Sequence, residues 1–117
     1  MIQRDITNQL VEAVKQYPVV FLTGPRQSGK STLLKYIFSN YQYVSLEDID
    51  NREFATSDPR GFLSTYSNKT IIDEAQNVPS LFSYIQSRVD SIGETGMYIL
   101  SGSQNFLLMQ SISQSLA

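Results

Sequence analysis

The segment from Gly24 to Ser31, which reads GPRQSGKS, constrains the fold of this chain more than any other. Two glycines separated by four residues and followed by a lysine and a hydroxyl residue fit the spacing of a phosphate-binding P-loop. Such a loop joins a buried strand to a helix, because its N–H groups and the helix N-terminus together bind phosphate oxygens. The apolar run 19–22 before it suits a buried strand. The apolar residues after it fall on one side of a helix: Leu33, Leu34, Ile37 and Phe38.

Each position of the loop has an expected role. Gly24 and Gly29 allow backbone conformations and close approaches that a Cβ would obstruct. Lys30 is expected to bring its ammonium group to the outer phosphates, and Ser31 to offer its hydroxyl to Mg²⁺. Arg26 lies inside the loop, where a structural or ion-pair role is favoured over a catalytic one. The other predicted phosphate-binding positions are Pro25, Gln27, Ser28 and Thr32.

The composition indicates one domain over residues 1–117, because the chain has 117 residues and is 41% hydrophobic. The net charge of −2 provides no basic field for nonspecific nucleic-acid binding, although it does not exclude such a partner. Cysteine and histidine are absent, so any chemistry must use carboxylates, hydroxyls, Lys, Arg and bound metal. No apolar run reaches the ~20 residues that span a bilayer, and no signal peptide is visible, so no membrane partner and a cytoplasmic location are expected.

Several further elements are predicted around the loop. Apolar residues between Ile6 and Tyr17 recur at helical spacing, so a helix is expected to cover the edge of the sheet. A short strand is expected over 43–46, followed by Glu47, Asp48 and Asp50, where a solvated acidic loop is favoured over a metal site.

Two helices are expected in the second half of the chain. One should begin at Asp58 and Pro59, since Asp caps free N–H groups and Pro suits the first helical position. The other should open at Pro79 and run to Ile92, with Arg88 as a solvated flanking residue.

Asp73 and Glu74 directly follow the short apolar strand Thr70–Ile72. Ligands bind at the carboxyl ends of parallel strands, the same edge of the sheet that carries the P-loop. Adjacent strand residues point to opposite faces, so the two carboxylates can take different roles. Asp73 is predicted to hold Mg²⁺ and Glu74 to orient or deprotonate an attacking water.

The fourth strand is expected over 97–100 and leads into Ser101, Gly102, Ser103 and Gln104. Ser103 or Gln104 could hydrogen-bond the γ-phosphate or the attacking water, or Ser103 could simply cap the next helix. That helix, from Phe106 onward, stops at Ala117 in mid-pattern, so a fragment of a longer protein is expected.

The nucleotide is predicted to be ATP. The GTPase motif Asp-x-x-Gly is not met by Asp73 to Gln76, and the later Asn-Lys-x-Asp is not met by Asn68 to Ile71. The adjacent Asp and Glu favour hydrolysis over phosphoryl transfer to a small molecule, because a kinase must exclude water and usually has an arginine-rich lid.

Three motifs of the chain together resemble those of the N-terminal ATPase domain of the prokaryotic AAA-type predicted ATPases that carry a C-terminal DUF4143 domain. The resemblance rests on GPRQSGKST at 24–32, IDEAQNVP at 72–79 and LSGSQNF at 100–106. It implies a three-layer α/β/α P-loop NTPase sandwich of the additional-strand type, with a mainly parallel sheet and the strand bearing Ser101 in the middle. It also implies a Mg²⁺-dependent ATPase with Lys30, Ser31 or Thr32, Asp73 and Glu74 as functional positions and Ser103 or Gln104 as the sensor.

The same resemblance implies that the parts used for an arginine finger, a second sensor and a C-terminal domain lie beyond Ala117. A possible homo-oligomer is expected from fold-level analogy alone. Two other function classes stay open. One is an ATP-binding switch that controls a partner without efficient hydrolysis, and the other is a small-molecule kinase.

Overall fold

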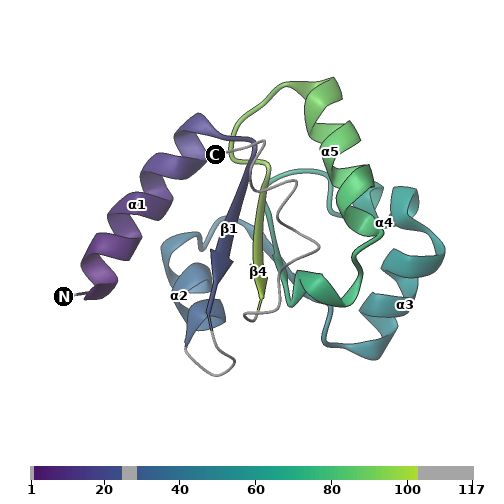
Figure 1. The fold of residues 1–117 in the computed structure, drawn as a ribbon, viewed down its shortest axis with the longest axis horizontal. Helices are drawn as coiled ribbons and strands as arrows, with labels where there is room; N and C mark the ends of the chain where they lie inside the picture. The colour runs from purple at the N-terminus through teal and green to yellow at the C-terminus, as the bar shows by residue number, and fades with distance from the viewer. Residues whose placement is uncertain (1, 25–28, 103–117) are drawn as a thin grey trace.

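A computed structural model of the chain describes residues 2–24 and 29–102. Four parallel strands form one sheet (Figure 1). In spatial order they are β1 (Val19–Thr23), β4 (Tyr98–Gly102), β3 (Thr70–Asp73) and β2 (Gln42–Ser45). The chain therefore has the predicted α/β fold, with the strand bearing Ser101 between those that lead to Gly24 and Asp73.

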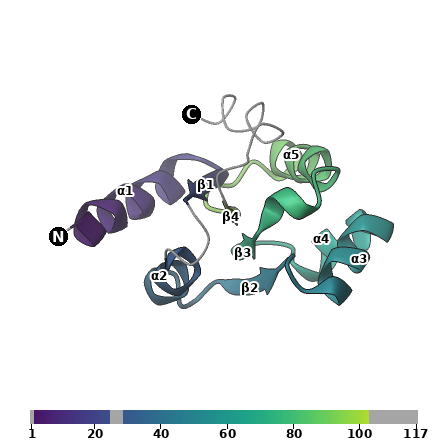
Figure 2. The ribbon, with the colours of Figure 1, turned by 60° about the horizontal axis from the view of Figure 1, so that its bottom comes forward.

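Helices cover both faces of this sheet, which gives three layers (Figure 2). One face carries α1 (Ile2–Gln16) and α2 (Lys30–Ile37). The other face carries α3 (Ile49–Ser57), α4 (Pro59–Thr65) and α5 (Leu81–Ile92). As expected, α1 packs against β1, an edge strand of the described sheet.

The strands alternate between two hydrophobic cores, because successive side chains of a strand point to opposite faces. The core beneath α1 and α2 takes one residue from each of three strands and adds apolar residues of those helices: Val20, Ile71, Ile99, Leu10, Leu34 and Phe38. The core beneath α3, α4 and α5 takes their sequence neighbours Val19, Ile72, Tyr98 and Leu100, among others. All four strands are thereby held with their carboxyl ends at one edge.

The acidic segment after β2 is solvent-exposed, as expected, but it leads into a helix instead of forming a loop. It begins helix α3, and the side chain of Asp48 accepts a hydrogen bond from the Asn51 N–H as its N-cap. Low apolar periodicity hid this helix, because its buried face rests mainly on Ala55 and Phe54. The expected start of α4 is confirmed, since Asp58 accepts from the Gly61 N–H and Pro59 is the first helical residue.

Arg88 is not the solvated flanking residue that the sequence suggested. It is half-buried, and its Nε donates a 3.1 Å hydrogen bond to the Ser67 carbonyl. Helix α5 begins at Leu81, two residues after the predicted start at Pro79. The predicted helix from Phe106 lies outside the described residues.

Within the described ranges, no helix is both long and apolar enough to cross a membrane.

Candidate nucleotide-binding site

The carboxyl ends of β1 and β4 meet where the glycine-rich loop begins. The Gly24 N–H donates a 3.2 Å hydrogen bond to the Gly102 carbonyl, which ties the end of β1 to the end of β4. At the far side of the loop, Gly29 has φ of 84° and immediately precedes α2. A side chain is strained in that left-handed conformation, so the turn into α2 requires glycine. Pro25, Arg26, Gln27 and Ser28 lie outside the described residues.

Lys30 opens α2 and is buried against the end of β3. Its Nζ lies 4.0 Å from Oε2 of Glu74, and the two side chains are only 7% and 9% exposed. The contact places the ammonium group of Lys30 directly beside the carboxylate of Glu74. The predicted phosphate-binding lysine and the predicted catalytic glutamate are thus in contact.

Asp73 is the most heavily hydrogen-bonded side chain of the site. Its Oδ1 accepts from the Ser101 hydroxyl at 2.7 Å and from the Glu74 N–H at 2.9 Å. Its Oδ2 accepts from the Tyr43 hydroxyl at 2.6 Å. The residue is 7% exposed, so these donors replace the water that a buried carboxylate loses. Strands β2, β3 and β4 together fix the orientation of this carboxylate.

Tyr43 connects Asp73 to the helix that follows the loop. Burial raises the pKa of the Tyr43 hydroxyl well above its usual value, and the hydrogen bond to Asp73 raises it further. The nearby Ser45 and Ser31 side chains act in the opposite direction on this pKa. The Nζ of Lys35 also lies 4.1 Å from the centre of the Tyr43 ring. The hydroxyl of Ser31 and the carboxylate of Asp73 therefore share one phenol as a neighbour.

Glu74 has left the strand, contrary to the simple alternation expected for the pair. It has φ of 53° and ψ of 46°, a left-handed conformation that is unusual for a residue with a Cβ. Its carbonyl accepts from the Asn77 N–H as the 3-10 helix η1 (Ala75–Asn77) begins. Its Oε1 accepts a 2.7 Å hydrogen bond from the Gln76 amide. The turn, rather than the pleat of the strand, separates the two carboxylates.

The structure thus brings together four predicted residues, Lys30, Ser31, Asp73 and Glu74. Thr32 lies on the exposed side of α2, whereas Ser103 and Gln104 fall outside the described residues. No cluster of three or more acidic side chains suited to a metal is found among the described residues.

Three contributors were missed by sequence reasoning, namely Tyr43, Gln76 and Ser101 as a partner of Asp73. Ser101 could have been identified from the sequence. A hydroxyl at the carboxyl end of a central strand lies beside the carboxyl ends of the neighbouring strands, one of which ends at Asp73. Tyr43 carried none, since it is separated from Asp73 by two helices in the chain and meets it only through strand pairing.

The donor set fits Mg²⁺ in its chemistry. Carboxylate and hydroxyl oxygens are the protein ligands that this hard cation prefers, and it commonly retains several waters. Asp73 offers carboxylate oxygens and Ser31 offers a hydroxyl oxygen. Both side chains lie near the Tyr43 hydroxyl. Mg²⁺ held between them could approach an anion that is bound by the N-terminus of α2.

A parallel sheet with a strand–loop–helix unit and carboxylates at the end of the next-but-one strand defines a P-loop nucleotide-binding domain. Residues 16–117 match the protein family described as AAA domain, and the chain belongs to that family. Family membership implies nucleotide binding.

Two mycobacterial proteins are similar over almost the whole chain. The uncharacterized protein Mb2031c of Mycobacterium bovis and the uncharacterized protein Rv2008c of Mycobacterium tuberculosis are each 37% identical to it over 117 residues. The similarity covers 98% of this chain but 26% of each relative. The chain therefore spans about a quarter of the length of the curated relatives that it matches.

Proposed function

We propose that this domain binds ATP with Mg²⁺ and hydrolyses it to ADP and phosphate. The observation that carries the proposal is the buried contact between Lys30 and Glu74, 4.0 Å apart, beside the fixed carboxylate of Asp73. Hydrolysis at a P-loop requires a cation that binds phosphate, a carboxylate that holds the metal ion and a second group that orients the attacking water.

The loop is proposed to hold the triphosphate. Backbone N–H groups of the loop between Arg26 and Thr32 would contact the phosphates, and Lys30 would neutralise the outer ones. Ser31 and Asp73 would hold Mg²⁺, which supplies charge neutralisation on the phosphate oxygens when bound. The hydrogen bonds that Asp73 receives would keep its carboxylate oriented toward that position.

Glu74 is proposed as the residue that orients or deprotonates the attacking water. Its present contacts with Lys30 and Gln76 engage both carboxylate oxygens. A phosphate oxygen that binds Lys30 would compete for the ammonium group and release one of those oxygens for water. ATP binding and preparation of the base would thereby be coupled through one lysine.

The remaining assignments extend the same proposal. Ser103 or Gln104 would sense the γ-phosphate, because both follow the end of β4, the strand beside β1. Residues 1–117 would form the N-terminal part of an ATPase domain whose movements act on further parts, including a DUF4143 domain. The much greater length of the mycobacterial relatives supports additional domains.

The test is the Glu74→Gln variant, assayed for release of phosphate and for binding of a fluorescent ATP analogue. We expect turnover to fall by about a hundredfold or more while nucleotide affinity changes little, since general-base catalysis contributes on the order of that factor. Glu53→Gln removes a matched charge from the exposed surface of α3 and should turn over normally.

Other outcomes would separate the alternative functions. Unchanged turnover in Glu74→Gln would refute the assigned role of Glu74. Tight ATP binding without phosphate release by the unaltered protein would favour the switch. Labelled γ-phosphate appearing on an acceptor rather than as free phosphate would identify a kinase.

A further inference from the structure

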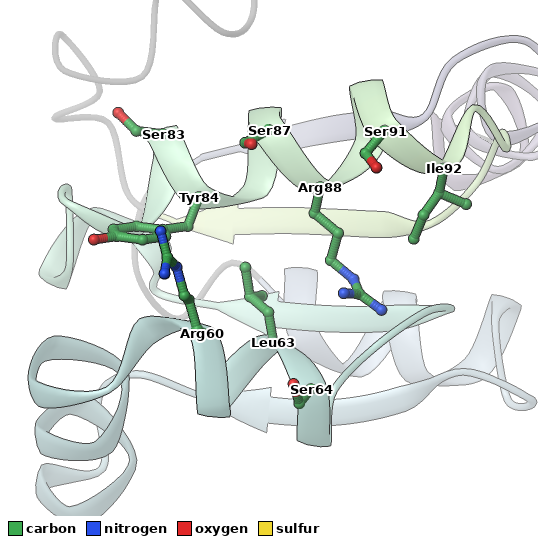
Figure 3. A pocket seen from close by; sticks show the side chains of 9 residues that line it. All are labelled: Arg60, Leu63, Ser64, Ser83, Tyr84, Ser87, Arg88, Ser91 and Ile92. Carbon is green, nitrogen blue, oxygen red and sulfur yellow. The ribbon is translucent and has the colours of Figure 1, made fainter.

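A groove of about 500 Å³ lies between α4 and α5, on the face of the sheet opposite α1 and α2. In Figure 3, Arg60 and Leu63 from α4 and Tyr84 and Arg88 from α5 point into the space between the two helices. The sheet separates this groove from Lys30, so it is a site distinct from the proposed nucleotide pocket.

The groove is cationic in a chain whose net charge is −2. Two arginines line it, and none of its described lining residues is acidic. Among the residues that the structure describes, neither guanidinium forms an ion pair with a carboxylate. Arg60 lies over the Tyr84 ring at 5.9 Å, and Arg88 donates to the Ser67 carbonyl at 3.1 Å. These neutral contacts orient the two guanidiniums without neutralising their charge.

The rest of the lining suits a protein ligand. The hydroxyls of Ser83, Ser87 and Ser91 recur every fourth residue along one side of α5 and offer uncharged hydrogen-bonding groups. Large apolar surface is also exposed there, because Tyr84 is 37% and Ile92 is 42% solvent-accessible. Tyrosine and arginine are the residues most enriched among energetically important interface contacts. A partly apolar groove with cationic side chains therefore fits a polypeptide better than a free small anion.

We propose that this groove binds a short, extended acidic segment of a partner protein. Tyr84 and Arg88 are one helical turn apart on α5, about 6 Å along the helix axis. Arg60 lies over the Tyr84 ring, so the two guanidiniums occupy successive turns of the groove. Side chains at alternate residues of an extended peptide lie on one face at a spacing of about 7 Å. Two carboxylates at alternate positions could thus meet the two arginines, with serine hydroxyls beside the peptide backbone.

Nucleic acid is the less suitable polyanion. A phosphate backbone extends past two cations and gains affinity from a continuous basic surface. Here Asp58 caps α4 and Asp90 lies on α5, so acidic side chains stand on the same two helices as the arginines. A short acidic peptide needs to contact only the lining of the groove, which contains no acidic side chain among the described residues.

The experiment measures fluorescence anisotropy of a labelled short peptide with aspartates at alternate positions, alongside a peptide with asparagines in their place. We expect the aspartate peptide to bind and the asparagine peptide to bind at least tenfold more weakly, with affinity falling as salt rises. Arg60→Gln should weaken binding of the aspartate peptide by about tenfold, because it removes one charge-assisted contact. Ser87→Asp should weaken it similarly through like-charge repulsion.

Lys15→Gln is the matched control, since it removes an exposed positive charge from α1, on the other face of the sheet. Circular dichroism should show native folding for Arg60→Gln, because Arg60 is exposed. Equal binding of the two peptides, no binding of either, or equal losses in Arg60→Gln and Lys15→Gln would overturn the proposal. Tighter, Arg60-dependent binding of a labelled single-stranded oligonucleotide would also overturn it, in favour of nucleic acid.

Discussion

The hydroxyl of Tyr43 donates a 2.6 Å hydrogen bond to Oδ2 of Asp73, although 30 residues separate them in the sequence. The bond crosses from β2 to β3, whose parallel pairing places Ser45 opposite Asp73. It fixes Oδ2 of this buried carboxylate, while the Ser101 hydroxyl and the Glu74 N–H fix Oδ1. The proposed metal ligand is thus held by three separate parts of the fold.

Replacing Tyr43 by phenylalanine should weaken Mg²⁺ binding in the presence of ATP by about tenfold, because residues that orient a metal ligand typically contribute that much to affinity. The measurement is the Mg²⁺ concentration that gives half-maximal nucleotide binding. Tyr41→Phe is the control, since it removes an equally short 2.6 Å hydrogen bond, to the Gly96 carbonyl. If both variants shift the Mg²⁺ dependence equally, Tyr43 has no specific role in orienting Asp73.

Gly29→Ala should lower both stability and nucleotide affinity. The residue has φ of 84°, and a Cβ there would meet no neighbouring atom of the described residues, so the expected cost is backbone strain of about 1 kcal/mol. Gly93→Ala imposes the same strain at the end of α5, where φ is 75° and the space is equally open. Urea unfolding should show similar losses for the two variants, whereas only Gly29→Ala should impair binding of the ATP analogue. Impaired binding in both would indicate a global effect.

Asp58→Ala should reduce the free energy of unfolding by about 1 kcal/mol, because its carboxylate accepts the Gly61 N–H at the start of α4. For a chain of this size the melting temperature should fall by roughly 4–8 °C. Ser80→Ala is a suitable comparison, since Ser80 precedes α5 but its side chain makes no cap hydrogen bond. A fall of the same size in Ser80→Ala would contradict the capping interpretation.

Alkaline conditions should destabilise the fold through its buried tyrosines. Burial raises the pKa of Tyr41 and of Tyr98 above the usual value of 10.0. Above pH 10.0 the tyrosines of the unfolded chain ionise, whereas these two phenols stay neutral in the folded protein. Their contribution to the free energy of unfolding is therefore complete below pH 10.0 and is lost as the pH rises further.

An absorbance titration of tyrosinate should therefore show some of the 7 tyrosines ionising later than the exposed ones. Tyr98→Phe should remove part of the delayed absorbance and lose the 2.7 Å hydrogen bond to the Tyr66 carbonyl. A single transition near pH 10.0 with the fold intact would be inconsistent with this account.

Much of the architecture was predictable because its signals are local. The apolar run before Gly24 predicted β1, and Asp58 with Pro59 predicted the start of α4. Helix α3 was missed, since its capping by Asp48 looks the same in sequence as a solvated acidic loop. Arg88 was misjudged for a related reason: its position on the helix suggested solvent, but the Ser67 carbonyl lies within its reach.

By itself the sequence determined the glycine-rich motif, the order of the four strands along the chain, the helices other than α3, and the candidate residues Lys30, Asp73 and Glu74. Each of these features is encoded by the pattern of residues within one short segment of the chain. Only the tertiary structure decided that Tyr43 and Ser101 hold Asp73, that Glu74 faces Lys30 from a left-handed turn, and that two arginines share a groove. Those relationships depend on strand pairing and helix packing between segments far apart in the chain, and no local pattern records which distant side chains will meet.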